Sequence, residues 1–316
     1  MTTTIERPPT AAAPMPARPP KPKRDRTSRS EERAGLAMLA PAVILLALFI
    51  FTPAILAFGL AFTNARLISP YPATFVGFDN FARLLTDPTF FRALLNVGYF
   101  ALVVVPLQAG LALVMAILVN KKVKGTTFFR TVYFLPVVTS MVVVSLLWLF
   151  MYRQDGLINV IIDRVTFGLV TGPDWLNDST TSMPAIILMS VWQGVGFHMI
   201  IWLSGLQTIP ADLYEAADLD GVSAWQRFRY ITWPGLSATR SLILVTITIQ
   251  ALSLFTQISV MTQGGPLNST TTVVYEAVES GFAQQETGYA SAISLVFFVI
   301  VLLISVVQRF LSREKA

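Results

Sequence analysis

The sequence predicts an all-α, polytopic membrane protein with six transmembrane helices. The 316 residues are 54% hydrophobic and only 13% charged, with a mean hydropathy of +0.62. A soluble domain is instead about 45–50% apolar and about 25% charged. In addition, six stretches approach or exceed the ~20 apolar residues that a helix needs to cross a bilayer: 35–62, 94–119, 131–152, 184–206, 238–258 and 288–308.

Each of these stretches is expected to be a helix, because backbone groups in lipid must be satisfied within the segment. None of them contains Asp, Glu, Lys or Arg, except for Arg240 at the start of the fifth. Pro53, Pro106 and Pro136 lie inside three of them. Prolines are tolerated inside a membrane because neighbouring helices can take up the freed carbonyls.

Residues 1–33 differ from the rest of the chain and are rich in Pro, Ala, Arg and Lys. Such a segment has too little apolar content to fold, so it is predicted to be a disordered basic tail. The remainder, 34–316, is predicted to form one six-helix domain. If the N-terminus is cytoplasmic, the cytoplasmic segments hold 18 of the 23 Lys and Arg residues. The positive-inside rule therefore places both termini in the cytoplasm, and it explains the net charge of +5 without nucleic acid.

The composition also excludes several kinds of site. The chain has no cysteine, so disulfides, thiol nucleophiles and cysteine metal sites are absent. Its single histidine, His198, cannot build a histidine-rich metal site; we interpret it as a packing or hydrogen-bonding residue rather than a proton relay. No paired carboxylates or nucleophile–base arrangement occur at membrane depth, so neither catalytic nor metal-binding residues are predicted.

A compact charged segment, 207–236, interrupts the apolar pattern between the fourth and fifth stretches. Pro210 suits the start of a short helix, and Gly221 suits its C-terminal break. Ser223 and Gln226 have the spacing of a capping box for a second short helix. The segment is either a well-capped linker between two spans or a docking element for a cytoplasmic partner, because two helices this short cannot bury their aromatic residues alone.

The stretch IPADLYEAADLDGVSAWQRFRYITWP (Ile209–Pro234) resembles the signature loop of binding-protein-dependent ABC importer permeases. Two residues depart from the family pattern: Val222 replaces the usual alanine, and Ala238 lies where a second proline is common. Three further stretches resemble the carbohydrate-uptake branch of that family, the maltose and glycerol-3-phosphate type: VGFDNFARLLTDPTFFRALLN (Val76–Asn96), GTTFFRTVYFLP (Gly125–Pro136) and MTQGGPLNSTTTVVYEAVESGF (Met261–Phe282).

The resemblance implies that segment 207–236 is a coupling helix that docks into a cytoplasmic ATPase subunit. The residues implied in this coupling are Glu215, Ala216, Ala217, Asp220, Gly221, Phe228 and Pro234. The implied partners are a second homologous permease, two ATPase subunits and an extracytoplasmic solute-binding protein, in a bacterial plasma (inner) membrane. ATP and magnesium would bind to the ATPase chains, because no glycine here is followed by the lysine of a phosphate-binding loop.

Polar residues within the spans are the candidates for a solute path. In the fifth stretch they follow one helical stripe at i, i+4, i+7 and i+11: Thr246, Gln250, Ser253 and Gln257. In the fourth stretch the candidates lie at or beside a glycine: Gln193, Gly194 and Phe197. Amide and hydroxyl groups with an aromatic ring suit a sugar-like solute. The alternative is that these side chains only hydrogen-bond between helices, as polar residues often do in membranes.

Two other functions compete with import driven by ATP. An ion-coupled secondary transporter usually carries ionisable residues in mid-span, and this chain has none there. A structural membrane subunit would not need the polar stripe. The resemblance suggests sugars, oligosaccharides or glycerol-phosphate esters as the small polar solute, and the sequence does not choose among them.

Overall fold

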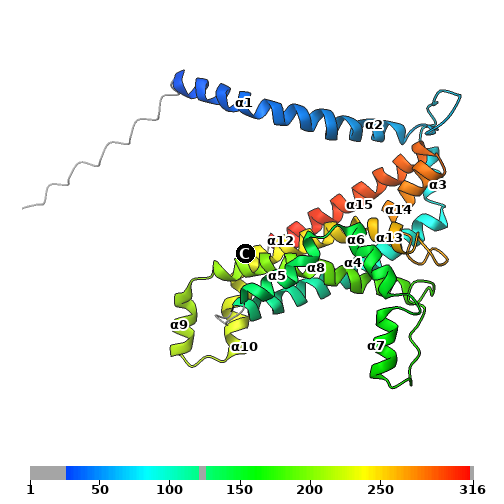
Figure 1. Ribbon diagram of the computed structural model, residues 1–316. Coiled ribbons are helices and arrows are strands. Elements are labelled where there is room, and N and C mark those ends of the chain that lie inside the picture. Colours follow the sequence, from blue (N-terminus) through cyan, green and yellow to red (C-terminus); the bar gives the residue numbers. More distant parts are fainter. Residues whose placement is uncertain (1–25, 121–125, 314–316) are drawn as a thin grey trace, which may run out of the picture. The chain divides into compact units, whose positions relative to one another are not determined.

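The computed structural model describes residues 26–120 and 126–313, which are predominantly helical (Figure 1). Apart from one isolated bridge between Thr63 and Phe75, these two ranges contain no strand. The all-α prediction is therefore confirmed. The chain divides into two compact units, Met1–Ile55 and Leu56–Ala316.

The first predicted span is helical, with an irregular turn at its centre. Helix α1 (Arg26–Leu46) leads through a π-helical turn, η1 (Ala47–Phe51), into α2 (Thr52–Leu60). The π turn ends two residues before Pro53, which has no N–H to donate. The Thr52 hydroxyl donates to the Ala47 carbonyl at 2.9 Å. Because α1 begins at Arg26, residues 26–33 are helical where the sequence predicts a disordered tail. The rest of that predicted tail, 1–25, lies outside the described residues.

Two long helices, α4 (Pro88–Asn120) and α8 (Ser182–Gln207), form the centre of the second unit. They correspond to the second and fourth predicted spans and pack against each other in the largest hydrophobic cluster. The buried Trp202 indole of α8 donates a hydrogen bond to the Ala109 carbonyl of α4 at 3.1 Å. That bond satisfies a polar group that would otherwise be unpaired in the core.

The third predicted span, 131–152, is not one straight helix. It consists of α5 (Thr126–Val138) and α6 (Met141–Met151), which are bent by 97° at the break between them. Pro136 removes a backbone donor in the last turn of α5, and residues 139–140 between the two helices are not helical. The described residues thus contain five helices that are long and apolar enough to cross a membrane, or six if α5 and α6 form one broken span.

The fifth predicted span also contains an interruption, whereas the sixth does not. Helix α12 (Ser237–Leu252) is separated from α13 (Thr256–Met261) by residues 253–255, which are not helical. Helix α15 (Thr287–Arg313) forms the sixth span. The interruption places backbone groups and polar side chains close together inside the helix bundle. A solute path through the bundle is expected at this place.

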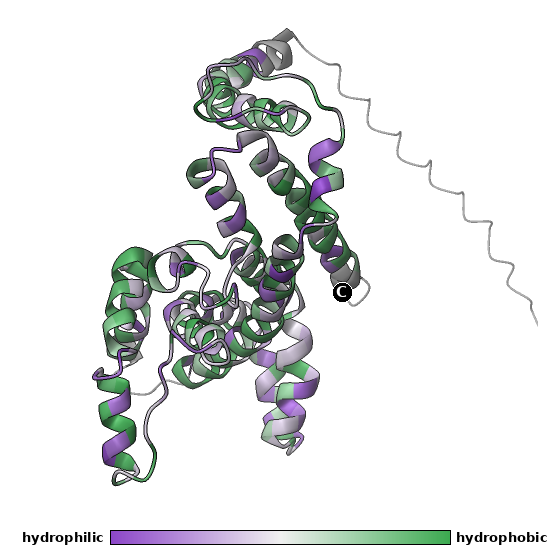
Figure 2. Ribbon diagram, turned by 90° about the vertical axis from the view of Figure 1, so that its right-hand side faces the viewer, coloured by the Kyte–Doolittle hydropathy of each residue, from purple (hydrophilic) through white to green (hydrophobic). Residues whose placement is uncertain are grey.

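Short helices occupy the two ends of this unit. Figure 1 shows α9 and α10 at one end, here called the α9 end, and α3 and α14 at the other, the α14 end. In Figure 2, hydrophobic residues predominate along the long helices. The short elements are α3 (Asp79–Leu84), α7 (Leu157–Val165), α9 (Ala211–Leu219), α10 (Ala224–Arg227), η2 (Phe228–Thr232), α11 (Trp233–Gly235), α14 (Val273–Val278) and η3 (Glu279–Ala283).

Helix α8 approaches three neighbours at glycines. A Cβ atom at Gly194 would overlap the Gln108 amide of α4, one at Gly196 would overlap the Tyr133 carbonyl of α5, and one at Gly205 would overlap the Thr239 side chain of α12. Small residues let membrane helices approach closely, so that packing and polar contacts can replace the hydrophobic effect, which does not drive association in lipid. These glycines therefore fix how α4, α5 and α12 assemble around α8.

We expect Gly196→Ala to destabilise the folded protein, because its Cβ would meet a backbone carbonyl that cannot rotate away. Overpacking of this kind costs about 1–3 kcal/mol. Gly98→Ala in α4 is the matched control: no atom lies within 4 Å of the added Cβ, and alanine is about 1 kcal/mol more favourable than glycine in a helix. Thermal unfolding in detergent should show a lower Tm for Gly196→Ala alone. An equal Tm for both variants would contradict close packing of α5 on α8.

Candidate solute path and partner-binding segment

A cavity of about 390 Å³ lies among α4, α8 and the α12–α13 interruption, beside the α5–α6 bend. Its size is within the range of about 300–1,000 Å³ typical of small-molecule sites. None of its lining residues is charged, and the polar ones offer amide, hydroxyl and imidazole groups: Gln108, Ser190, Gln193, His198, Gln250, Ser253, Thr256 and Gln257. Such walls can form hydrogen bonds with an uncharged polar solute.

One face of α8 forms the first wall of the cavity. Ser190, Gly194 and Phe197 follow one another at i, i+4 and i+7, so the helical period places them on that face. Gly194 is necessary at this point because the Gln108 amide of α4 occupies the space that a side chain would fill. The predicted path residues Gln193, Gly194 and Phe197 all line the cavity.

The α12–α13 region forms the opposite wall, and here the structure differs from the predicted stripe. Gln250, Ser253 and Gln257 line the cavity, but they do not lie on one continuous helix, because α12 ends at Leu252 and α13 begins at Thr256. Thr246 is not among the lining residues; its hydroxyl donates to the Leu242 carbonyl of its own helix at 2.8 Å. Of the four polar residues predicted in the fifth stretch, all except Thr246 thus line the cavity.

Sequence reasoning missed Gln108 as a member of this site and assigned His198 no place in it. Gln108 is 4% exposed and His198 is 1% exposed, and both line the cavity. A signal for Gln108 existed, since it is the one glutamine in the second predicted span. No comparable signal existed for His198, because the period of α8 alone does not show which face meets α4.

At the α9 end, the segment 207–236 folds as a helical hairpin, with the local structure that the sequence predicts. Gly221 has a φ of +68°, a conformation that favours glycine, and the Val222 N–H donates back to the Ala217 carbonyl at 3.0 Å. The Ser223–Gln226 capping box is present, with bonds of 3.0 and 3.3 Å. The Tyr214 and Thr232 hydroxyls, 3.0 Å apart, join the two arms.

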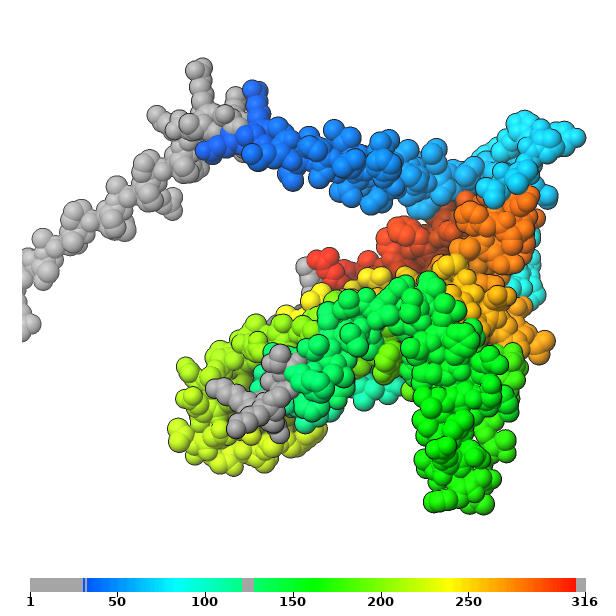
Figure 3. All heavy atoms as spheres, viewed as in Figure 1, coloured from blue at the N-terminus to red at the C-terminus, as the bar shows by residue number. Residues whose placement is uncertain are grey.

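The hairpin pairs some of its polar groups internally but leaves large apolar side chains exposed to solvent. Asp218 and Arg227 form an ion pair across the arms. In contrast, Leu219, Trp225 and Tyr230 are 90%, 67% and 70% exposed. Figure 3 shows this part of the chain, in yellow-green, protruding at its end of the unit. Exposed large apolar residues on one short hairpin are compatible with contact to another protein.

The predicted coupling residues have different environments within this hairpin. Ala217 is buried, and Phe228 is half-buried against the main hydrophobic cluster and stacks on Trp225. The others are exposed: Glu215, Ala216, Asp220, Gly221 and Pro234. Glu215 has no ion-pair partner among the side chains that the structure describes. Its carboxylate is therefore available to a residue of another chain.

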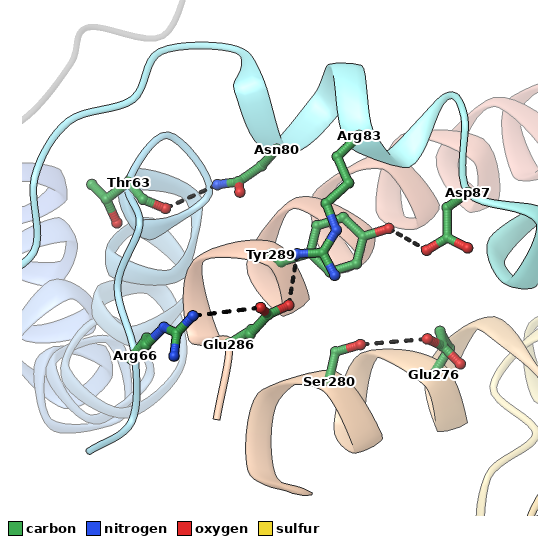
Figure 4. Close-up of polar contacts among 9 residues, drawn as sticks. All are labelled: Thr63, Arg66, Asn80, Arg83, Asp87, Glu276, Ser280, Glu286 and Tyr289. Carbon is green, nitrogen blue, oxygen red and sulfur yellow. Dashed lines mark hydrogen bonds and ion pairs between the residues drawn. The ribbon is translucent and has the colours of Figure 1, made fainter. Parts of the chain in front are cut away.

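At the α14 end, a polar cluster joins two loops that are distant in sequence (Figure 4). The Arg83 guanidinium contacts the Glu286 carboxylate at 2.7 Å and lies over the Tyr289 ring, 3.9 Å from its centroid. The Tyr289 hydroxyl donates to Asp87 at 2.5 Å. These contacts connect α3 and the start of α4 to the start of α15.

A third carboxyl group in this cluster, that of Glu276, is 8% exposed and accepts a hydrogen bond from Ser280 at 3.4 Å. Burial raises the pKa of Glu276, and the nearby Asp87 carboxylate raises that pKa further. The Ser280 bond and the Arg83 charge act in the opposite direction without cancelling the effect. The ionised form of Glu276 is therefore disfavoured in the folded protein.

Residues 108–316 match the family described as the inner membrane component of binding-protein-dependent transport systems. The chain belongs to this family. It is 34% identical to the lactose transport system permease protein LacF of Rhizobium radiobacter, over 89% of this chain and 94% of the relative. It is 30% identical to the diacetylchitobiose uptake system permease protein NgcF of Streptomyces coelicolor, over 94% and 87% of the two chains.

A similar fold is known from experiment. A crystal structure of a bacterial ABC transporter involved in the import of the acidic polysaccharide alginate contains a chain that matches with a TM-score of 0.77 at 25% identity, over 92% of this chain and 99% of that one. The permease is thus a multi-pass inner-membrane transport subunit with an all-helical fold. The predicted family and fold class are confirmed.

We expect Glu276→Gln to stabilise the permease at neutral pH. Because the folded pKa of Glu276 is above the ordinary value of 4.5, the folded state binds more protons than the unfolded state between those two values, and stability falls as the pH rises through that window. The uncharged variant avoids this loss, so its Tm advantage should grow with pH. Ser280→Ala, which removes a bond to the carboxylate, should give the opposite trend. A Tm difference that is constant from pH 4 to pH 8 would contradict the assignment.

Proposed function

We propose that this permease forms half of the transmembrane path for a neutral sugar or a similar solute, in an importer driven by a separate ATPase. The observation that carries this proposal is the uncharged polar cavity enclosed by α4, α8 and α12–α13. Six of its lining residues are the ones that the sequence marks as the path: Gln193, Gly194, Phe197, Gln250, Ser253 and Gln257.

The chemistry of these residues supports a hydroxyl-rich solute. Amide groups of Gln193, Gln250 and Gln257 can each donate and accept hydrogen bonds, as a sugar hydroxyl does. Phe197 offers an aromatic face for the C–H surface of a sugar ring. The relatives that import lactose and diacetylchitobiose support the same class of solute for this chain.

The proposed assembly contains a second permease, two ATPase subunits and an extracytoplasmic solute-binding protein. Binding-protein dependence is part of the family description. The ATPase subunits would bind ATP and magnesium, and the hairpin at 207–236 would dock into one of them. Its exposed Leu219 and Trp225, together with the unpaired Glu215 carboxylate, support this role.

We assign the α9 end to the cytoplasm and the α14 end to the outside, with both termini cytoplasmic. The distribution of Lys and Arg supports this orientation. The solute-binding protein would then dock at the α14 end, where the Arg83–Glu286 cluster holds the loops together.

We expect Gln250→Ala to lower solute uptake several-fold while the complex stays assembled and its basal ATPase activity is unchanged. Loss of one hydrogen bond to a bound solute typically costs about 0.5–1.5 kcal/mol. Ile249→Ala, one position earlier and outside the cavity, is the control. Uptake of labelled lactose, maltose and cellobiose into vesicles that contain the complete importer measures the effect. Normal uptake by Gln250→Ala, or a complex that falls apart, would favour a purely structural role for this residue.

We expect Glu215→Lys and Gly221→Ile to reduce receptor-stimulated ATP hydrolysis and uptake together. The first reverses a charge at the proposed contact, and the second places a β-branched residue at a φ of +68°. Asp163→Lys, an equal charge reversal at an exposed site on α7, should have no such effect. Pull-down of the ATPase subunit with each variant completes the test and also reports which end is cytoplasmic. If both variants bind the ATPase subunit and transport solute as the wild type does, the hairpin is only a linker between two spans.

A further inference from the structure

Helix α7, which connects to α6 on one side and to the chain leading into α8 on the other, has one exposed apolar face. Leu157, Ile161 and Val165 lie at i, i+4 and i+8, so the helical period places them on that face. They are 55%, 51% and 71% exposed. Asp163, which is also exposed, is two positions from Ile161 and therefore lies on the opposite side of the helix. Helix α7 is thus amphipathic, and its apolar face is uncovered in the part of the chain that the structure describes.

The side of α7 opposite Ile161 is covered by the chain that follows the helix. Asn159 is buried on that side; its amide donates to the Pro173 carbonyl at 3.3 Å and accepts from the Trp175 indole at 2.7 Å. Figure 1 shows this returning chain on the side of α7 that faces away from α9. The exposed apolar face is therefore directed back along the bundle, toward the level of the membrane-spanning helices.

The first turn of α7 lies at the level of an aromatic cluster at the end of α6. The ring centroids of Trp148 and Tyr152 are 5.2 Å apart, and those of Tyr152 and Trp175 are 5.6 Å apart. Trp and Tyr are enriched where the hydrocarbon of a bilayer meets its headgroups. The Trp175 indole holds Asn159 at this level, and α7 runs crosswise to the spanning helices α4 and α8 (Figure 1). A crosswise helix that begins at the interface stays there along its length.

The apolar face of α7 also continues an apolar surface of α6. Leu146, Leu147 and Phe150 of α6 are exposed, and only residues 152–156 separate the two helices. Helices that lie in the membrane interface bury an apolar face at the boundary of headgroups and acyl chains and keep charged groups in water. Arg164 is at the edge of the apolar face of α7, where its aliphatic stem can follow that boundary while its guanidinium reaches the headgroups.

We propose that α7 is an interfacial helix, which lies on the bilayer surface at the α14 end with Leu157, Ile161 and Val165 buried among the lipids. The lipid bilayer, rather than another protein, covers the apolar face. The helix anchors the connection between α6 and α8 in the plane of the membrane. This anchoring goes beyond the proposed transport role and requires neither the solute path nor a particular orientation of the two ends.

A spin label distinguishes lipid from the other possible surroundings of this face. Oxygen concentrates in lipid, and the neutral chelate nickel ethylenediamine diacetate concentrates in water, so collisions with each reagent report where the label lies. A label packed against a second permease or a solute-binding protein is shielded from both reagents. Because the chain has no cysteine, an introduced cysteine is its only labelling site.

The test uses the complete importer, assembled from cysteine-free partner subunits in nanodiscs of phosphatidylethanolamine and phosphatidylglycerol. Ile161→Cys places the label on the apolar face, and Asp163→Cys is the matched control on the opposite side of the same helix. Phe150→Cys on α6 and Ser179→Cys in the exposed loop serve as the lipid and water references. We expect the ratio of oxygen to nickel collisions at position 161 to be several-fold higher than at position 163 and to approach that of the lipid reference.

Two outcomes would overturn the proposal. A label at position 161 that collides with the nickel chelate as often as the water reference would place α7 in solvent. A label shielded from both reagents would place a protein on the face, and shielding that occurs only after the solute-binding protein is added would identify that protein as the partner. Leu157→Cys and Val165→Cys provide independent measurements, because both share the face of Ile161 and should share its lipid signal. Size-exclusion chromatography of each labelled importer checks that it remains assembled.

Discussion

The close approach of α8 to its neighbours is the constraint on which the rest of the second unit depends. Gly194, Gly196 and Gly205 let α4, α5 and α12 each come nearer than a side chain would permit. In lipid no hydrophobic force drives helices together, so packing and polar contacts must hold them. The same closeness brings Gln108 to Gly194 and thereby forms one wall of the cavity. Stability and the candidate solute path therefore share one structural origin.

The distribution of charge distinguishes an importer subunit from an ion-coupled transporter. Ion pairs in the described ranges lie in the loops and end segments, at Arg66, Arg83, Arg153 and Arg227. The cavity walls carry no charged side chain that could bind a proton or a coupling ion. This absence agrees with membership in the binding-protein-dependent family and supports the proposal that a separate ATPase drives transport.

The two ends of the unit are built for different tasks. At the α14 end, Arg83, Glu286 and Tyr289 satisfy one another and hold distant loops in place. At the α9 end, caps and the Asp218–Arg227 pair complete the hairpin internally, yet Leu219 and Trp225 stay in solvent. A rigid hairpin with an apolar tip can transmit force from a partner, because its shape does not depend on that partner.

The sequence by itself determined the all-α membrane fold, the family and the hairpin, because apolar length, caps and the Gly221 turn are local properties. Tertiary structure decided where helices break. The α5–α6 bend and the gap after Leu252 depend on neighbours that accept irregular backbone, so a continuous apolar run did not reveal them. It also decided the membership of the cavity. Thr246 shares a stripe with Gln250 yet does not line the cavity, whereas His198 does, because helical period gives a face but only packing shows what that face meets.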